Sequence, residues 1–243
     1  MDNLHIDQHI SQQFNSDLEH LRTHLLELGG MVEAQVVDAV KAIETADGNL
    51  AERVLQTEQE VDRREIALDR ECTLILARRQ PAASDLRLVL MVTKTTHDLE
   101  RMGDEADKIA KMAIAINEDG GASPRGYVEL RHIATNVIKM VNACLDAFAR
   151  YDVSQAIKVV RDDALVDMEY RSALRELITY MMEDPRSITR VMNILWALRA
   201  LERIGDHARN IAENVIYMVH GMDVRHIPIA EIENRLAAQI KNL

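Results

Sequence analysis

Carboxylates recur at helical spacing in two segments of the chain that lie 102 residues apart. The positions are Glu100, Asp104 and Asp107 in the first segment and Glu202, Asp206 and, as an amide, Asn210 in the second. Side chains four residues apart on a helix are neighbours, and two carboxylates placed in this way repel each other by roughly 0.2–0.5 kcal/mol. A pair that occurs twice therefore needs a nearby cation, which either the protein or a metal ion supplies.

A second pair of acids precedes each of these segments. Glu58 and Asp62 precede the first, and Asp163 and Asp167 precede the second. If the helices that carry these pairs adjoin the later ones, several carboxylate oxygens meet at one place in each half. Sites that are rich in oxygen and free of cysteine suit Mg, Ca, Mn or Fe ions more than structural zinc. Each half is therefore a candidate metal site.

Arginine is the alternative source of positive charge. Arg101 and Arg203 lie inside the two segments, and an arginine from an adjacent helix can bond both oxygens of a carboxylate. The residues by themselves leave the metal and the arginine interpretations open.

The two segments are copies of one another. Leu99–Ala110 aligns without gaps to Leu201–Ala212, and eight of the twelve positions are identical. Each copy contains a glycine in mid-helix, Gly103 or Gly205, where glycine costs about 1 kcal/mol relative to alanine. Close packing of helices, or room beside a ligand cluster, would explain that cost.

The repetition predicts two three-helix bundles, residues 1–120 and 123–222, followed by a C-terminal piece, residues 223–243. Apolar residues in this last piece have the spacing of a short amphipathic docking helix. They are Ile229, Ile232, Leu236 and Ile240.

Six long amphipathic helices must position the acids. Their predicted ranges are about 17–46, 50–79, 84–118, 125–150, 153–183 and 187–220. Capping side chains mark several starts, among them Ser16, Asn49 and Asp152, each with Glu or Gln three residues later. Because the connections between long helices are short, neighbouring helices are antiparallel and the bundles are elongated.

The composition agrees with an all-α fold. Of 243 residues, 47% are hydrophobic but only 3% are aromatic, and the chain has 9 glycines and 4 prolines. Strands favour the aromatic and β-branched residues, whereas the abundant Leu, Ala and Glu favour helices.

Charge and cysteine usage limit the classes of function. The formal net charge of -11 repels phosphate backbones, so we expect no nucleic-acid partner. Cys72 and Cys144 lie far apart and indicate reduced thiols. The sequence has neither a signal peptide nor an apolar run of membrane-spanning length, so we expect a cytoplasmic protein without direct membrane insertion.

The sequence predicts that the protein is not an enzyme and that it has neither catalytic nor cofactor-binding residues. Phosphate-binding glycine loops and a nucleophile elbow are missing. Glu129 and His132 form one half of a di-iron carboxylate pattern, but that pattern needs a second copy, which does not occur. His97 lies in a helical segment similar to those of phosphoacceptor histidines, yet no nucleotide-binding domain follows it. A di-iron carboxylate enzyme and a metal-free helical scaffold are the alternatives considered.

The duplicated Leu-Glu-Arg-(Met/Ile)-Gly-Asp segments, with acid pairs on the preceding helices, resemble the PhoU family of bacterial phosphate-signalling proteins. The opening residues 9–14 and 18–22 are also similar to the start of that family. The resemblance covers nearly the whole chain. It implies two three-helix bundles, a homodimer, and a negative regulator of the phosphate-starvation response. Such a regulator couples the phosphate ABC transporter, through its ATPase subunit, to a membrane sensor histidine kinase.

The resemblance also implies metal-binding motifs of the form Glu or Asp, three residues, Asp. Carried over to this chain, the ligands are Glu100, Asp104 and Asp107, then Glu202, Asp206 and Asn210, with Asp62, Asp167, Glu58 and Asp163 from the preceding helices. The sequence does not distinguish Fe, Mn, Mg, Zn and Ni. Because Arg209 stands where the first copy has Asp107, we expect the second site to be weaker or to hold a different ion.

Overall fold

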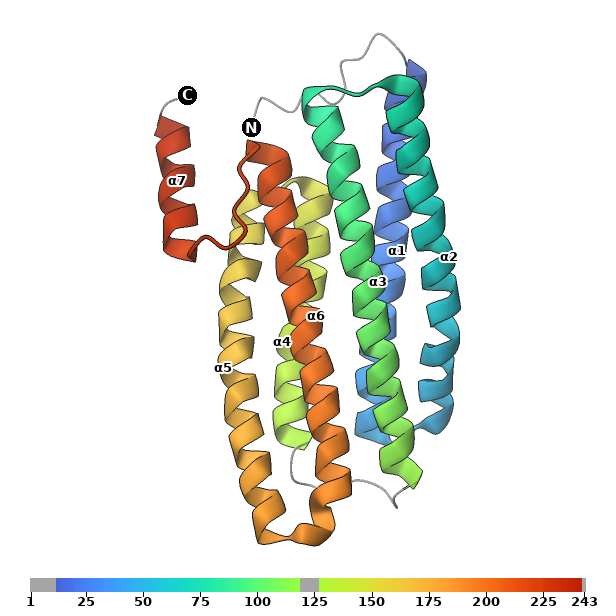
Figure 1. The fold of residues 1–243 in the computed structure, drawn as a ribbon, viewed down its shortest axis with the longest axis vertical. Coiled ribbons are helices and arrows are strands. Elements are labelled where there is room, and N and C mark those ends of the chain that lie inside the picture. Colours follow the sequence, from blue (N-terminus) through green and yellow to red (C-terminus); the bar gives the residue numbers. More distant parts are fainter. Residues whose placement is uncertain (1–11, 119–126, 242–243) are drawn as a thin grey trace.

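The computed structural model describes residues 12–118 and 127–241, which contain seven α-helices, one short 3-10 helix and no strand (Figure 1). The elements are α1 (Gln12–Thr45), α2 (Gly48–Arg79), α3 (Ala83–Glu118), α4 (Tyr127–Arg150), α5 (Val153–Glu183), η1 (Pro185–Ser187), α6 (Ile188–His220) and α7 (Ile229–Lys241). All six predicted long helices are present. None of the described helices combines the length and the apolar character of a membrane span.

Two predicted helix starts are wrong. Ser16 lies inside α1, which begins at Gln12, and the side chain of Gln13 donates to Asp17 one turn later at 3.0 Å. Asn49 lies inside α2, whose cap is Asp47. Aspartate and asparagine are equally good helix caps, because either side chain can accept a hydrogen bond from a free backbone N–H. Residue preference alone therefore does not distinguish Asp47 from Asn49 as the cap of α2.

The helices form two antiparallel three-helix bundles, as predicted. In one bundle α1, α2 and α3 pack together, and in the other α4, α5 and α6 do. The bundles join along α3 and α6, which lie side by side in the middle of the elongated molecule (Figure 1). The contact of α1 with α4 extends this junction.

The two halves repeat in backbone conformation as they do in sequence. Ala46 and Tyr151, at the ends of α1 and α4, both adopt the left-handed conformation, with φ of 52° and 55°. The next residues, Asp47 and Asp152, cap α2 and α5, and each accepts a hydrogen bond of 3.0 Å from the backbone N–H three residues later. Equivalent positions in these helices are thus 105 residues apart.

Aliphatic side chains fill the core and hold the short C-terminal helix. Ile232 and Leu236 of α7 are buried, the helix contacts α5, and Arg161 pairs with Glu233 across this contact. The predicted docking helix is confirmed in this respect, and the side chain of Ile240 lies outside the described residues. The predicted free thiols, Cys72 and Cys144, are buried.

Candidate metal centre

The acids of the first half come together between α2 and α3. The pKa of Glu58 is raised to about 7, chiefly by burial and also by the negative charges of Asp104, Asp62 and Asp107, whereas the hydrogen bond from Gln35 lowers it. That bond runs from Gln35 Nε2 to Glu58 Oε2 at 2.7 Å. The predicted grouping of the two helices' acids is therefore present in the structure.

Gly103 makes room for this cluster. A Cβ atom at Gly103 would lie 2.9 Å from Glu58 Oε2 and 3.2 Å from Gln35 Oε1, too close for both oxygens. At Gly205 of the second half, the nearest atoms are Met140 Cε at 3.7 Å and Asp163 Oδ1 at 3.8 Å, an ordinary contact distance. At Gly103 the glycine thus leaves room beside the acid cluster.

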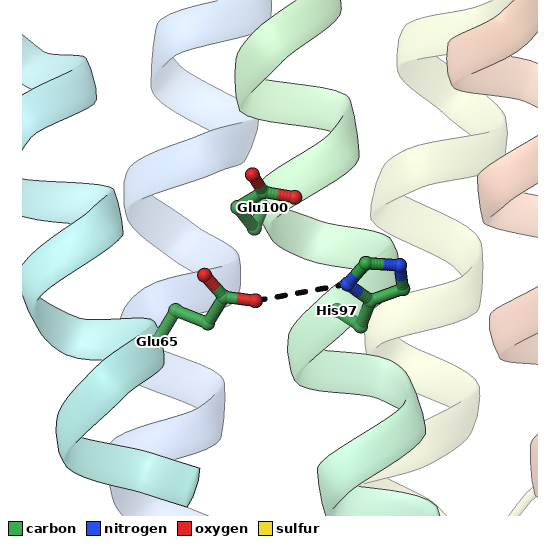
Figure 2. A group of neighbouring side chains, drawn as sticks. All are labelled: Glu65, His97 and Glu100. Carbon is green, nitrogen blue, oxygen red and sulfur yellow. Dashed lines mark ion pairs between the residues drawn. The ribbon is translucent and has the colours of Figure 1, made fainter.

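Two further residues extend the first cluster and were not predicted. Glu65 of α2 and His97 of α3 lie beside Glu100, and one ligand atom from each of the three falls within 4.8 Å of the others (Figure 2). His97 Nδ1 is 3.7 Å from Glu65 Oε1. A signal for Glu65 was available, because Glu58, Asp62 and Glu65 have the same i, i+4, i+7 spacing as the acids of α3.

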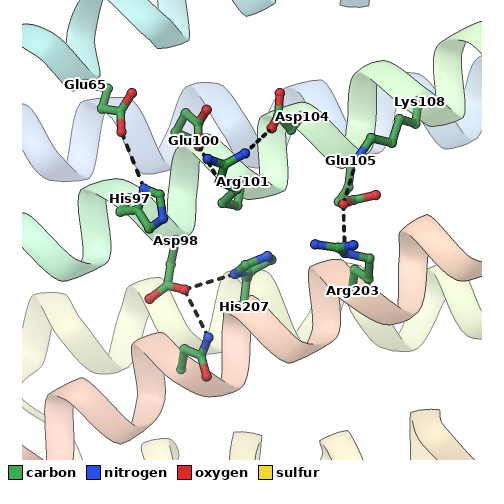
Figure 3. A network of polar contacts seen from close by, with 11 residues as sticks. Glu65, His97, Asp98, Glu100, Arg101, Asp104, Glu105, Lys108, Arg203 and His207 are labelled. Carbon is green, nitrogen blue, oxygen red and sulfur yellow. Dashed lines mark hydrogen bonds and ion pairs between the residues drawn. The ribbon is translucent and has the colours of Figure 1, made fainter.

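Protein cations also reach the first cluster, as the arginine interpretation expects. Arg101 Nη1 lies 2.9 Å from Asp104 Oδ2 and Arg101 Nε lies 3.2 Å from Glu100 Oε2 (Figure 3). Lys111 Nζ lies 2.6 Å from Asp107 Oδ2. Both cations come from α3 itself, not from an adjacent helix.

The second half gathers its acids between α5 and α6. Burial raises the pKa of Asp163 to about 6, with Asp206 and Asp167 raising it and Arg209 lowering it. Burial also raises the pKa of Glu202, and the charge of Asp206 adds to this effect. The four predicted acids of this half are therefore close enough to influence one another.

Arginines neutralise much of this second cluster. Arg209 Nη1 lies 3.2 Å from Asp163 Oδ2, and its Nε donates to Glu213 Oε1 at 2.9 Å. Arg199 Nη1 donates to Glu202 Oε1 at 2.7 Å. Arg209, which stands where the first half has Asp107, thus pairs with an acid of the second cluster. A weaker site or a different ion in the second half stays a prediction.

The structure does not bring Asn210 into the second cluster. The Asn210 amide donates to Asp98 Oδ1 of α3 at 3.1 Å, and His207 Nδ1 lies 3.0 Å from the same oxygen (Figure 3). Asn210 is one helical turn beyond Asp206, but the neighbouring α3 offers it a nearly buried carboxylate. The prediction that groups Asn210 with Glu202 and Asp206 is corrected in this respect.

The donor set fits a divalent cation. Among the cluster acids, buried oxygens that accept no hydrogen bond from a described residue are Glu58 Oε1, Glu202 Oε2 and Glu100 Oε2, the last of which lies 3.2 Å from Arg101 Nε. Buried oxygens without hydrogen bonds are costly, and a hard cation is the partner they suit. Among the described residues, one group of three has its ligand atoms within 4.8 Å of one another, namely Glu65, His97 and Glu100. Metal binding by the predicted acid pairs of the two halves therefore stays a prediction.

Comparison with known proteins identifies the relatives of this chain. A family model described as PhoU domain matches residues 25–113 and 130–215. The phosphate-specific transport system accessory protein PhoU homolog of Pseudomonas aeruginosa is 59% identical over 233 residues, 94% of this chain and 96% of the relative. The Escherichia coli phosphate-specific transport system accessory protein PhoU is 44% identical over 239 residues, 98% of each chain.

Solved structures agree with these matches. The crystal structure of PhoU from Pseudomonas aeruginosa superimposes with a TM-score of 0.84, covering 86% of this chain and all of that chain. The phosphate transport system regulatory protein PhoU from Streptococcus pneumoniae, 29% identical, gives 0.80, covering 87% of this chain and 99% of that chain. These names describe accessory and regulatory proteins, which supports the prediction that the chain is not an enzyme.

Proposed function

Because the chain belongs to the PhoU family, we propose that it is a cytoplasmic accessory protein of a phosphate-specific transport system and a negative regulator of the phosphate-starvation response. The observation that carries this proposal is the 59% identity to an accessory protein of such a system over 96% of that protein's length. The similar fold of a phosphate transport system regulatory protein from Streptococcus pneumoniae supports the regulatory part.

The proposed partners are the ATPase subunit of the phosphate ABC transporter, a membrane sensor histidine kinase and a second copy of the chain. A regulator that catalyses nothing acts only by binding one state of a partner more tightly than another. We propose that it favours the kinase state that leaves the response regulator inactive when phosphate is plentiful. The charged faces of the two bundles are the proposed contact surfaces.

In this role the two acid clusters bind metal ions. Glu58, Asp62, Glu100, Asp104 and Asp107 hold an ion in the first half. In the second half the corresponding acids are Asp163, Asp167, Glu202 and Asp206. A bound cation would neutralise the carboxylates and tie each second helix to the third. The buried oxygens Glu58 Oε1 and Glu202 Oε2, which accept no hydrogen bond in the described structure, support this part of the proposal.

The proposal can be tested by complementation in a bacterial strain whose own gene for this regulator has been deleted. With a phosphate-regulon reporter and plentiful phosphate, the wild-type chain restores repression, whereas Glu100→Ala and Asp206→Ala restore it poorly. Glu52→Ala changes an exposed acid outside both clusters and restores repression fully. Failure of the wild-type chain to repress would contradict the regulatory role, and full repression by both cluster variants would contradict the role of the acids.

Partner binding is measured separately. The cytoplasmic portion of the kinase, immobilised on beads, should retain the chain more strongly from extracts of phosphate-replete cells than from extracts of starved cells. Equal retention in both conditions would rule out regulation through this contact.

A metal-free helical scaffold is the second candidate. The ion pairs of Arg101 and Arg199 with cluster acids favour it. Elemental analysis of protein purified without a histidine tag distinguishes the two functions, because only the first predicts bound metal after buffer exchange.

A further inference from the structure

A pocket of about 400 Å³ is lined by α6 and by residues 221–228, which join α6 to α7. Basic side chains make up most of its lining, although the chain as a whole has a formal net charge of -11. They are Arg199, Arg203, His207 and Arg209 of α6 with Arg225 and His226 of the joining segment. The function proposed above uses none of these basic groups.

The internal repeat shows that this basic lining is particular to the second half. Residues 102 apart correspond in α3 and α6. Arg209 takes the place of Asp107, and His207 takes the place of Glu105. Two carboxylates of the first half are thus replaced by basic side chains in the second.

The segment after α6 presents two of the basic residues on a turn. The backbone N–H of Ile227 donates to the Val224 carbonyl at 3.1 Å, so Arg225 and His226 are the central residues of this turn. Val224 is 1% exposed and Ile227 is partly buried, which anchors both ends of the turn in the core. The Arg225 side chain is held by Asp223, with 3.0 Å between Nε and Oδ1. Its guanidinium group is therefore positioned before a ligand arrives.

Buried carboxylates hold the arginines of α6 on the protein side of the pocket. Arg203 Nε lies 2.8 Å from Glu105 Oε1, and Arg209 Nη1 lies 3.2 Å from Asp163 Oδ2. These acids are 4% and 5% exposed, whereas the arginines are 46% and 36% exposed. A guanidinium group has five N–H donors. Since contacts with described residues use one donor of Arg203 and two of Arg209, the others are available to a ligand.

The pocket offers hydrogen-bond acceptors as well as donors. Asp206 and Glu213 also line it, and Glu213, which is 5% exposed, lies outside the predicted metal ligands. An ionised carboxylate only accepts hydrogen bonds, so it repels a fully ionised oxyanion such as sulfate. Hydrogen phosphate suits both kinds of group, because its ionised oxygens accept from guanidinium groups and its O–H donates to a carboxylate.

We propose that this pocket binds hydrogen phosphate, with Arg209 and Arg225 on its ionised oxygens and the Glu213 carboxylate accepting its O–H. The choice of phosphate among protonated oxyanions rests on the function proposed above, whereas the donors and acceptors of the pocket do not depend on it. Paired N–H groups of arginine match the geometry of phosphate oxygens. The regulator then detects, without a partner, the ion whose transport it accompanies.

Isothermal titration calorimetry of the full-length, tag-free protein with inorganic phosphate tests the inference. The protein is first treated with a chelator, because metal ions would bind phosphate themselves. At about pH 8 and constant ionic strength, wild type should bind phosphate saturably. Arg225→Ala should weaken this binding about tenfold or more, the effect expected when a charge-assisted hydrogen bond is lost.

The matched control is Arg186→Ala. Arg186 also pairs with an aspartate two residues earlier, with 3.0 Å between Nε and Asp184 Oδ1, but it does not line the pocket. Its replacement should leave phosphate binding unchanged. Circular dichroism before each titration confirms that the variants are folded.

Sulfate and phenyl phosphate test the role of the phosphate O–H. At about pH 8 both are almost fully ionised, since a phosphate monoester loses its second proton with a pKa of about 6, whereas inorganic phosphate keeps one proton. Both should bind to wild type about tenfold more weakly than phosphate, because they leave the carboxylate without a donor. Glu213→Gln should narrow this difference, because an amide donates to an ionised oxygen.

The outcomes separate this inference from the proposed function. Absence of phosphate binding by wild type, an equal loss in Arg186→Ala, or equal binding of sulfate or phenyl phosphate overturns the inference and leaves repression in the reporter strain as a separate result. Phosphate binding that falls in Arg225→Ala, persists in Arg186→Ala and exceeds sulfate binding supports it. The same result in a chain that fails to repress supports the site and contradicts the regulatory role.

Discussion

Glu58 illustrates how burial and neighbouring charges act on a single side chain. Its pKa is raised from 4.5 to about 7, first by burial and then by Asp104, Asp62 and Asp107. The folded protein therefore holds the Glu58 proton more tightly than the unfolded chain does. The resulting contribution to stability is complete below about pH 4.5 and is lost as the pH rises through about 7.

Replacing Glu58 by glutamine tests this statement in chelator-treated protein. The amide keeps an acceptor for Gln35 and carries no charge. The variant should thus be more stable than wild type at about pH 8, by roughly 1 kcal/mol after allowing for solvent screening, and equal to it near pH 4.5. Urea unfolding at both pH values measures the difference. A variant that is less stable than wild type at the higher pH would show that the Glu58 carboxylate does not carry this burial cost.

At the scale of the helices, the equivalent glycines Gly103 and Gly205 differ in the space that surrounds them. A Cβ atom added at Gly103 of α3 would lie 2.9 Å from an oxygen of Glu58 and 3.2 Å from one of Gln35, whereas a Cβ atom added at Gly205 of α6 would meet its nearest neighbour at 3.7 Å. Both lie in the middle of helices, where alanine is favoured over glycine by about 1 kcal/mol.

We therefore expect opposite results from the same substitution in the two halves. Gly205→Ala should raise the free energy of unfolding by up to about 1 kcal/mol, because the methyl group finds ordinary contact distances and the helix gains propensity. Gly103→Ala should gain little stability and should weaken metal binding, because the Glu58 carboxylate must move away. Urea unfolding and Zn²⁺ titration of both variants measure this. Equal stabilisation with unchanged metal affinity at both positions would show that the space at Gly103 has no role in the cluster.

At the scale of the whole molecule, buried charges join the two bundles. Glu105 of α3 is 3% exposed and lies 2.8 Å from Arg203 Nε of α6 and 2.9 Å from Lys108 Nζ (Figure 3). Asp98 of α3 is held by His207 and Asn210 of α6. The contact between the repeats thus combines apolar packing with specific polar pairs.

Removal of one of these charged partners should lower the stability of the whole molecule towards unfolding. Arg203→Ala leaves the buried Glu105 with Lys108 alone and should lower the free energy of unfolding by about 1–3 kcal/mol. Arg63→Ala is the control, because Arg63 pairs with Glu60 of its own helix and is 72% exposed. Its effect should stay within about 0.5 kcal/mol. Thermal and urea unfolding measure both, and equal effects would mean that the buried pair adds nothing to the junction of the bundles.

The sequence determined the features that depend on neighbours along the chain. The helices, their amphipathic faces and the duplication follow from residue spacing, because the helical period is a local property. The family was recognised by the resemblance of the duplicated segments. The same period places Glu100 beside Asp104 and Glu202 beside Asp206, whatever the rest of the chain does. The metal occupancy of these acids stays a prediction.

Only the tertiary structure decided which side chains meet across two helices. Those contacts depend on how far each helix is rotated and shifted against its neighbour, which no local spacing specifies. In the structure Asn210 donates a hydrogen bond to Asp98, and Arg209 donates one to Asp163. It also places Glu65 and His97 beside Glu100. Two helices that look alike in sequence therefore present different partners, His97 beside Glu65 and Glu100 in one half and Arg199 beside Glu202 in the other.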